Sequence, residues 1–319
     1  MNKKELVRRV LAGQPVPRPP AAFWYHFTPE QRSGAAAVQA HLDFYRETNV
    51  DFLKVMNERL YRVDQRPTRA SEWRHVRPAP VSSPYFQSLL DEIKEISDAV
   101  GDETLLLITI HGIFASAFHA TESPEETFAR ANPVVAHLRE DPQAVMSGLD
   151  AISDGLIDLS LACLDAGVDG VYYGALGGEK YRFTEEEFIE YIKPYDLKIL
   201  NETFPSGEFN ILHICKDQVR LELYADYPGD VVNWSVTEQN PDIAAGREIF
   251  QRPILGGMDY RGVIVEGPPD AITDEVYATL DQLGTEGLML GADCTLPTST
   301  PNQHIRTAVE ATASYAVRR

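Results

Sequence analysis

Short runs rich in β-branched and aromatic residues alternate with longer helical patterns along most of the chain, and this alternation restricts the possible fold more than any other feature. Such an order is typical of parallel strands that are joined by crossover helices. The runs with strand composition are 21–27, 52–56, 105–111, 167–173, 210–215, 231–236, 254–259 and 287–293. The clearest helical patterns lie between and after them, at 36–48, 142–166, 184–204, 241–250, 271–284 and 302–317.

The sequence thus predicts eight strands that alternate with helices, and eight is the number of strands in a closed barrel of this type. We therefore predict an α/β fold, a (β/α)8 TIM barrel that forms a single domain over residues 1–319. A doubly wound open sheet is the alternative, but it rarely needs eight evenly spaced units, and no clear glycine-rich nucleotide loop supports it. The apolar spacing of Leu6, Val7, Val10 and Leu11 predicts a short amphipathic helix before the barrel.

The charge of the chain restricts its partners. It has 29 basic and 48 acidic residues and a net charge of −19. Because phosphate binding needs clustered lysine and arginine, we expect no binding to nucleic acid or to an anionic membrane surface. Residues 1–13 lack the apolar run of a signal peptide, and no stretch is long enough to span a membrane. Three cysteines do not make a disulfide framework, so we expect a cytoplasmic protein.

Reactive side chains gather at the carboxyl ends of the strands in a parallel barrel. The candidates at these ends are His26, Asn57, Glu58, His111, Tyr173, His213, Cys215, Trp234, Asp259 and Cys294. Two of the three cysteines belong to this set. The remaining one, Cys163, lies within an apolar helical pattern, and we expect it to be inert core.

His213, Cys215 and Cys294 have the residue types of a metal site. His213 and Cys215 are two positions apart, so in a strand they point to the same face. Cys294 lies at the corresponding end of the last predicted strand. One imidazole and two thiolates suit Zn²⁺, and three protein ligands leave the open position of a catalytic zinc. From spacing alone, cysteines that merely fill the core are the alternative.

The other candidates have a functional and a structural interpretation each. Glu58 is a candidate for a fourth zinc ligand or a substrate contact. Asp259 could orient a ligand or take a proton, or it could be a turn carboxylate. Substrate contacts are expected from His26, Asn57, His111, Tyr173 and Trp234. For the histidines and aromatic residues among them, the alternative is a structural histidine or a core side chain.

Three segments resemble the uroporphyrinogen decarboxylase superfamily: KKELVRRVLAGQPVPRPP, TEEEFIEYIKPYDLKIL and GADCTLPTSTPNQHIRTAVEA. The resemblance extends over essentially the whole chain and implies the same barrel. The decarboxylases carry a basic pair after strand one, where this chain reads WYHFTPEQR with only Arg32. They carry a carboxylate at the end of strand two, where this chain has Asn57 beside Glu58. They also carry a histidine in the last loop, where this chain has Cys294 or a neighbour.

Within the superfamily, the chain resembles the branch of methylcobalamin-dependent methyltransferases. Their zinc ligands follow the pattern His-x-Cys and a distant Cys, which His213, Cys215 and Cys294 match. The resemblance implies methyl transfer from a methylated corrinoid to a coenzyme M-like thiol or to tetrahydrofolate. It further implies Zn²⁺ as cofactor, methylcobalamin or another corrinoid as co-substrate, and a corrinoid carrier protein as a transient partner. A uroporphyrinogen decarboxylase-like lyase and a non-catalytic relative that binds corrinoid or metal are the alternatives.

Overall fold

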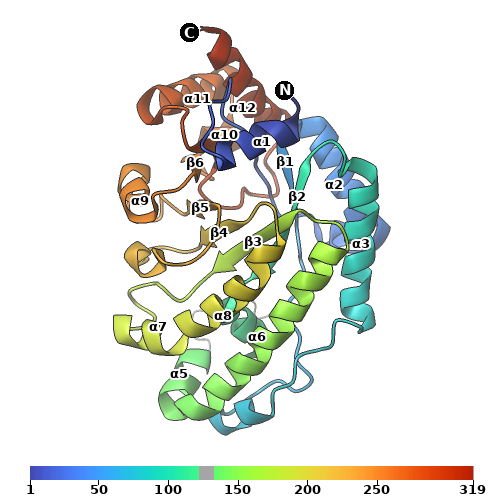
Figure 1. Cartoon of the computed structure of the whole chain (residues 1–319), viewed down its shortest axis with the longest axis vertical. Helices are drawn as coiled ribbons and strands as arrows, with labels where there is room; N and C mark the ends of the chain where they lie inside the picture. Colours follow the sequence, from blue (N-terminus) through green and yellow to red (C-terminus); the bar gives the residue numbers. More distant parts are fainter. Residues whose placement is uncertain (122–132, 319) are drawn as a thin grey trace.

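A parallel sheet forms the centre of the molecule (Figure 1). The computed structural model describes residues 1–121 and 133–318. Within them, the strands lie side by side in sequence order, each parallel to the next. They are β1 (Phe52–Val55), β2 (Leu105–His111), β3 (Gly170–Ala175), β4 (Ile211–Ile214), β5 (Val231–Trp234), β6 (Ile254–Met258) and β7 (Leu288–Ala292). Most strand residues are buried, as in a parallel sheet whose faces are both covered.

Helices surround the sheet (Figure 1). They are α1 (Lys3–Leu11), α2 (Gly34–Thr48), α3 (Pro84–Val100), α4 (Ile113–Thr121), α5 (Pro133–Glu140), α6 (Pro142–Asp165), α7 (Glu185–Tyr191), α8 (Lys193–Thr203), α9 (Ile243–Phe250), α10 (Val263–Glu266), α11 (Pro269–Leu283) and α12 (Asn302–Arg318). Short 3-10 turns lie at Pro29–Gln31, Ala70–His75, Phe204–Ser206 and Leu221–Tyr224. The predicted N-terminal helix is confirmed as α1, which buries Leu6, Val7 and Val10.

The helix predicted at 184–204 is two helices, α7 and α8, and the single-helix prediction is wrong. Its predicted start is confirmed, because the Thr184 hydroxyl accepts a hydrogen bond from the backbone N–H of Glu187. The break falls at Ile192, just before Pro194 in the first turn of α8. Proline has no backbone N–H to continue a helix, so a new helix begins there.

The strand predicted at 21–27 is not a strand in the structure. Its backbone makes two isolated parallel bridges, Ala21 with Leu290 and Tyr25 with Leu296. The N–H of Asp51, just before β1, donates to the carbonyl of Ala21 at 2.9 Å. The segment therefore lies between β7 and the start of β1, but its bonds are divided between both sides and form no continuous ladder. The described residues form a seven-stranded sheet, and the closed eight-stranded barrel in a single domain stays a prediction.

The two faces of the sheet are distinguished at neighbouring positions of β3. The ring of Tyr172 stacks on His213, with centroids 5.3 Å apart, whereas the hydroxyl of Tyr173 bonds to Asp196 of α8. Successive residues of a strand point to opposite faces. The Tyr172 side is therefore the one on which the metal-type residues lie, and the Tyr173 side packs against helices.

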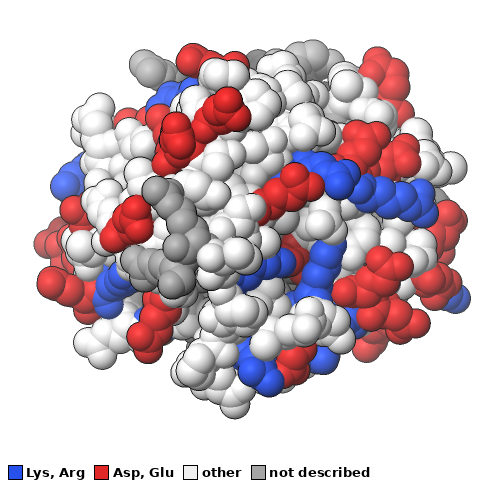
Figure 2. Space-filling model, turned by 90° about the horizontal axis from the view of Figure 1, so that it is seen from above, with Lys and Arg blue, Asp and Glu red and all other residues white. Residues whose placement is uncertain are grey.

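The surface carries intermixed charges. On the face shown in Figure 2, basic side chains occur in short runs beside acidic ones. Within residues 1–121 and 133–318, no helix has both the length and the apolar character needed to cross a membrane.

Candidate metal centre

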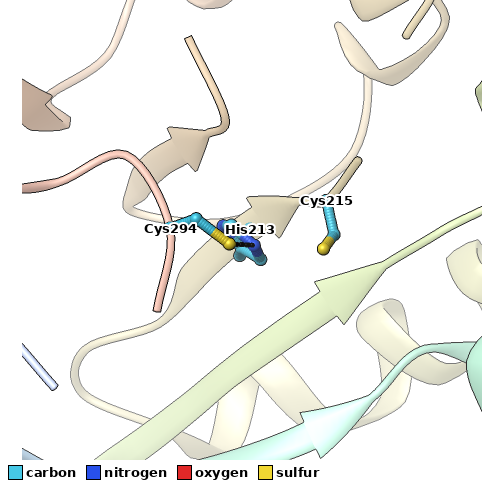
Figure 3. Close-up of side chains that lie close together, drawn as sticks. All are labelled: His213, Cys215 and Cys294. Carbon is cyan, nitrogen blue, oxygen red and sulfur yellow. Dashed lines mark hydrogen bonds between the residues drawn. The ribbon is translucent and has the colours of Figure 1, made fainter. Parts of the chain in front are cut away.

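His213, Cys215 and Cys294 come together at the carboxyl edge of the sheet (Figure 3). His213 belongs to β4, Cys215 directly follows that strand, and Cys294 lies two residues after β7. Their ligand atoms all lie within 4.8 Å of one another, and Cys294 Sγ is 4.0 Å from His213 Nε2. Tetrahedral zinc would hold such atoms about 3.7 Å apart, so small side-chain movements would let these three residues bind one ion.

Asn233 of β5 orients the histidine. Its Nδ2 donates to the carbonyls of Leu255 at 2.9 Å and Ala292 at 3.2 Å, so its Oδ1 faces His213. His213 Nδ1 lies 2.6 Å from that oxygen and must be the protonated nitrogen. Nε2 therefore keeps its lone pair, and it faces Cys294. A hydrogen-bonded second nitrogen of this kind is usual for a histidine that ligates a metal.

The two cluster cysteines interact with each other. The hydrogen bond from the Cys215 thiol lowers the pKa of Cys294 well below its ordinary value, and His213 lowers it further. The same bond, together with burial, raises the pKa of Cys215. Cys163 lies apart, on α6, where burial raises the pKa of its thiol to about 12. A thiolate is therefore favoured on Cys294 and disfavoured on Cys163 of α6.

Glu58 and His26 pair with each other at the rim. His26 Nδ1 lies 3.1 and 3.0 Å from the two carboxylate oxygens of Glu58, and the N–H of Phe27 donates to one of them. Burial opposes ionisation of Glu58, but the His26 contact holds its pKa below the ordinary value. The structure places Glu58 outside the group of three ligand-type residues, and its role as a ligand or substrate contact stays a prediction.

Asn57 and His111 lie together on a small cavity beside Tyr61. Asn57 Oδ1 accepts a hydrogen bond from the N–H of Arg59 at 3.1 Å, as in a local turn. His111 is the last residue of β2, and its ring packs edge-on against the ring of His119, with centroids 4.9 Å apart. Burial lowers the pKa of His111 well below its ordinary value, so the ring is neutral at pH 7. Substrate binding by either residue stays a prediction.

Tyr173 and Trp234 lie on the helix side of the sheet. The hydroxyl of Tyr173 donates to Asp196 of α8, and Trp234 Nε1 donates to the carbonyl of Pro241 at 2.8 Å. The structure does not bring either of these predicted substrate contacts to the cysteine cluster. In each strand the preceding residue faces His213 instead.

Asp259 lies in the turn after β6, where its Oδ1 accepts from the N–H of Arg261 at 2.9 Å. Its catalytic role stays a prediction. Asp293, which sequence reasoning treated only as a strand end, fixes the adjacent loop. Its two oxygens accept from the N–H of Thr237 and of Tyr260, each at 2.9 Å. This carboxylate therefore anchors the segment that carries the second cluster cysteine.

Lys54 of β1 is a site residue that sequence reasoning missed. Its side chain is buried, with Nζ 3.9 Å from the ring centroid of Tyr172 and 4.6 Å from that of Trp24. Burial lowers the pKa of Lys54 to about 7, against the opposing charges of Cys294 and Glu58. The available signal was a lysine within the apolar run FLKVM, because lysine is almost never fully buried without a reason.

A cavity of about 640 Å³ opens beside Glu58, and four arginines line it: Arg32, Arg59, Arg62 and Arg66. Arg59 is paired with Glu92, at 2.9 and 2.6 Å. Of these, only Arg32 lies in the segment where the decarboxylases carry a basic pair, and the other three lie in the loop after β1. The rim is therefore richer in cations than the strand ends suggest.

The comparisons with known proteins agree on the fold. Residues 53–315 match the family described as uroporphyrinogen decarboxylase (URO-D). No curated protein matches the chain. A methyltransferase from Methanosarcina mazei has a TM-score of 0.74 at 16% identity, covering 99% of both chains. A B12-independent methionine synthase from a Shewanella species, in complex with selenomethionine, has a TM-score of 0.59 at 10% identity, covering 94% of this chain and 97% of that one.

A putative vitamin B12-independent methionine synthase from Listeria monocytogenes has a TM-score of 0.53 at 13% identity, covering 87% of this chain and 85% of that one. At such identities, the similarity to solved structures shows a shared fold, while activity must be argued from the site. The family match spans most of the chain, including all three metal-type residues. The chain belongs to the uroporphyrinogen decarboxylase family.

Proposed function

We propose that this protein is a zinc-dependent methyltransferase, which moves a methyl group from a methylated corrinoid to a thiol or to tetrahydrofolate. The observation that carries the proposal is the convergence of His213, Cys215 and Cys294 within 4.8 Å. One imidazole and two thiols suit zinc, and they are one ligand fewer than its tetrahedral shell takes. The methyltransferase from Methanosarcina mazei shares the fold along the full length of both chains.

The residues around the cluster support this chemistry. Asn233 presents the lone pair of His213, and Asp293 holds the loop of Cys294. When bound, zinc would lower the pKa of an acceptor thiol and so make a thiolate available at neutral pH. With a thiol acceptor, the thiol would give up its proton to solvent, a sulfur–carbon bond would form as the cobalt–carbon bond of the donor breaks, and the electron pair of the broken bond would stay with the corrinoid. With tetrahydrofolate, the new bond would be nitrogen–carbon and the proton would leave that nitrogen.

The proposal implies a protein partner. A corrinoid carrier protein would deliver the methyl donor to the carboxyl edge of the sheet, and a small-molecule methyl acceptor would bind beside the cluster. Both would be encountered in the cytoplasm.

The test compares the same substitution, cysteine to alanine, at two positions of the chain. Cys215→Ala removes a cluster ligand, and Cys163→Ala removes the buried thiol of α6. Zinc-loaded protein is mixed with methylcobalamin and candidate acceptors, and demethylation is followed in the corrinoid spectrum. We expect one zinc per chain and turnover in wild type and Cys163→Ala, and loss of both in Cys215→Ala. Transfer by Cys215→Ala at the wild-type rate would refute the proposal.

A second candidate, a decarboxylase, is favoured by the four arginines beside Glu58. A substrate with several carboxylates needs paired cations, because buried uncompensated charge costs several kcal/mol, roughly, per ion. The same preparations are therefore incubated with uroporphyrinogen under reducing conditions, and released carbon dioxide is measured. Release by wild type would favour the lyase. Metal binding without either reaction would favour a non-catalytic relative.

A further inference from the structure

The cavity beside Glu58 has a charge opposite to that of the chain as a whole. Its lining includes four arginines and one carboxylate, whereas the net charge of the chain is −19. Cations that gather around one space repel one another unless anions neutralise them. A cavity lined in this way, in so acidic a protein, favours an anionic ligand.

Two of the arginines retain nitrogens for a ligand. The guanidinium of Arg62 lies 3.8 Å from the centroid of an aromatic ring and forms no ion pair within the described residues. Arg32 uses only Nε, which donates to a backbone carbonyl at 3.0 Å and lies 3.9 Å from Glu58. Arg59, by contrast, is buried and paired with Glu92. The cavity therefore offers at least two guanidinium groups, each able to bind a carboxylate through parallel hydrogen bonds.

The size and the walls of the cavity favour an organic acid over a small inorganic anion. A volume of about 640 Å³ lies in the range of pockets that enclose an organic ligand of moderate size. Apolar and aromatic side chains alternate with the arginines in the lining: Leu60, Tyr61, Val63, Tyr85 and Ala120. Such walls suit a ligand in which an aromatic ring carries the acid groups.

The cavity and the metal-type cluster lie at the same edge of the sheet. Glu58 lies three residues after the end of β1, and Cys215 directly follows β4. At about 4.8 Å for each strand spacing, β4 is roughly 14 Å from β1 along the sheet. A molecule that reaches both places must be elongated, with its reactive atom at one end and its acid groups at the other. A short thiol does not have this form.

We propose that the cavity binds the glutamate end of a reduced folate, so that the methyl acceptor is tetrahydrofolate and not a thiol. This inference rests on the proposed function and chooses between its two acceptors. The folate carries its acceptor nitrogen in the pterin, an aminobenzoyl ring in the middle and two carboxylates at the far end. Arg32 and Arg62 pair with these carboxylates, and the ring packs against the apolar walls. In the transfer, the nitrogen loses its proton and binds the methyl carbon, while the electron pair of the cobalt–carbon bond stays with the corrinoid.

The test separates the tail of the folate from its reactive end. Calorimetry on the full chain compares 4-aminobenzoylglutamate with 4-aminobenzoate, which lacks the glutamate, and with inorganic phosphate. Tetrahydrofolate and tetrahydropteroate give the same comparison for the whole molecule. The variants Arg32→Gln and Arg62→Gln each remove one cation from the cavity, and Arg62→Lys keeps the charge without the planar fork. Arg46→Gln is the matched control, because Arg46 is exposed on α2 and does not line the cavity.

We expect wild type to bind each glutamate-bearing ligand tighter than its partner without glutamate. Arg32→Gln and Arg62→Gln should each weaken binding of 4-aminobenzoylglutamate about tenfold, as is usual for the loss of a charge-assisted hydrogen bond. Arg62→Lys should retain part of the affinity, and Arg46→Gln should bind as wild type does. In turnover, KM for tetrahydrofolate should rise in the cavity variants with little change in kcat. Zinc content and the unfolding midpoint should stay those of wild type, because both arginines are exposed.

Equal binding with and without the glutamate, or unchanged binding in both cavity variants, would overturn the inference. Tighter binding of phosphate than of the tail, or arginine-dependent binding of uroporphyrinogen in its place, would also overturn it. Arginine-dependent binding of the tail without any methyl transfer would refute the proposed function and leave the folate site standing. Methyl transfer to a thiol by a protein that binds no folate would do the reverse.

Discussion

At the scale of single residues, Asn233 matters because it fixes which nitrogen of His213 is free for a metal. We predict that Asn233→Ala lowers zinc affinity about 10- to 100-fold, the usual effect of removing such a partner. Competition with a chromophoric chelator measures it. Asn302→Ala, on α12, is the control and should bind zinc as wild type does. Equal affinity in both variants would mean that the histidine is oriented without the amide.

For Cys163 we predict the opposite result, namely that its substitution does not change zinc binding. Its thiol is fully buried on α6 and is not part of the metal-type cluster. Cys163→Ala should leave the zinc content unchanged and should lower the free energy of unfolding by on the order of 1 kcal/mol, as a modest core truncation does. Metal analysis and urea unfolding measure the two quantities. Loss of zinc from folded Cys163→Ala would show that the ligands are assigned wrongly.

The sequence predicted the three cluster residues because a histidine and two cysteines, residue types that bind zinc, lie at the ends of two predicted strands. It missed Lys54 and Asn233, whose roles depend on what other strands place opposite them. Asn233 is in register with His213 across β4 and β5, which no local pattern encodes. Tyr173 and Trp234 were chosen one position away from the residues that face the cluster. With a side-chain period of two, such a shift moves a residue to the other face.

At the scale of elements, the alternation of composition predicted β1 to β7 and most helices, because buried strands and amphipathic helices have distinct periods. The prediction failed where the pairing of a strand depends on residues that are distant in the sequence. Residues 21–27 have strand composition, but their bonds divide between Leu290 on one side and Asp51 on the other. Composition indicates which residues are buried and which backbone conformation they prefer. It does not indicate whether the neighbouring segments on both sides form a continuous ladder of hydrogen bonds with the strand.

The contact between β3 and α8 predicts a pH dependence of stability. Asp196 is fully buried among Tyr173, Tyr227 and the N–H of Ile113, and burial raises its pKa from 3.8 to about 6. Between about pH 4 and 6 the folded state holds this proton and the unfolded state does not. The stabilisation by this group is therefore complete below pH 4 and is lost as the pH rises to 6.

The measurement is the difference in unfolding free energy between wild type and Asp196→Asn, followed from pH 4 to 7. Asparagine does not titrate, so the difference should shift against wild type by on the order of 2 kcal/mol across the window and stay constant above it. Asp150→Asn, at an exposed position on α6, is the matched control. A flat difference for Asp196→Asn would mean that its carboxyl is already ionised at pH 4.

At the scale of the whole molecule, the N-terminal segment joins the two ends of the sheet. Arg18 binds both oxygens of Asp51, at 2.6 and 2.7 Å, and reaches Thr312 of α12 at 3.2 Å. Asp51 also accepts from the N–H of Ala21 at 2.7 Å. The first strand, the segment beside the last strand and the final helix thus meet at one fully buried carboxylate.

Asp51→Asn tests this connection. The change keeps the side-chain volume but removes the negative charge, so Arg18 loses its ionic partner. Asparagine also places an NH2 donor where the carboxylate accepted hydrogen bonds from Arg18 and from the N–H of Ala21. We predict a loss of about 3 kcal/mol in the free energy of unfolding, as is usual when one partner of a buried pair is removed. Urea unfolding measures it through a lower midpoint at an unchanged m-value, since the exposed surface on unfolding is the same.

The same substitution at a solvated pair supplies the comparison. Asp150 pairs with Lys198 at 2.7 Å and its side chain is 57% exposed, so Asp150→Asn should cost less than about 1 kcal/mol. Zinc content should remain that of wild type in both variants, because neither carboxylate contacts the cysteine cluster. If both substitutions cost the same, the sheet ends are held by their apolar packing and not by Asp51. If Asp51→Asn also loses metal, the N-terminal segment supports the cluster as well as the fold.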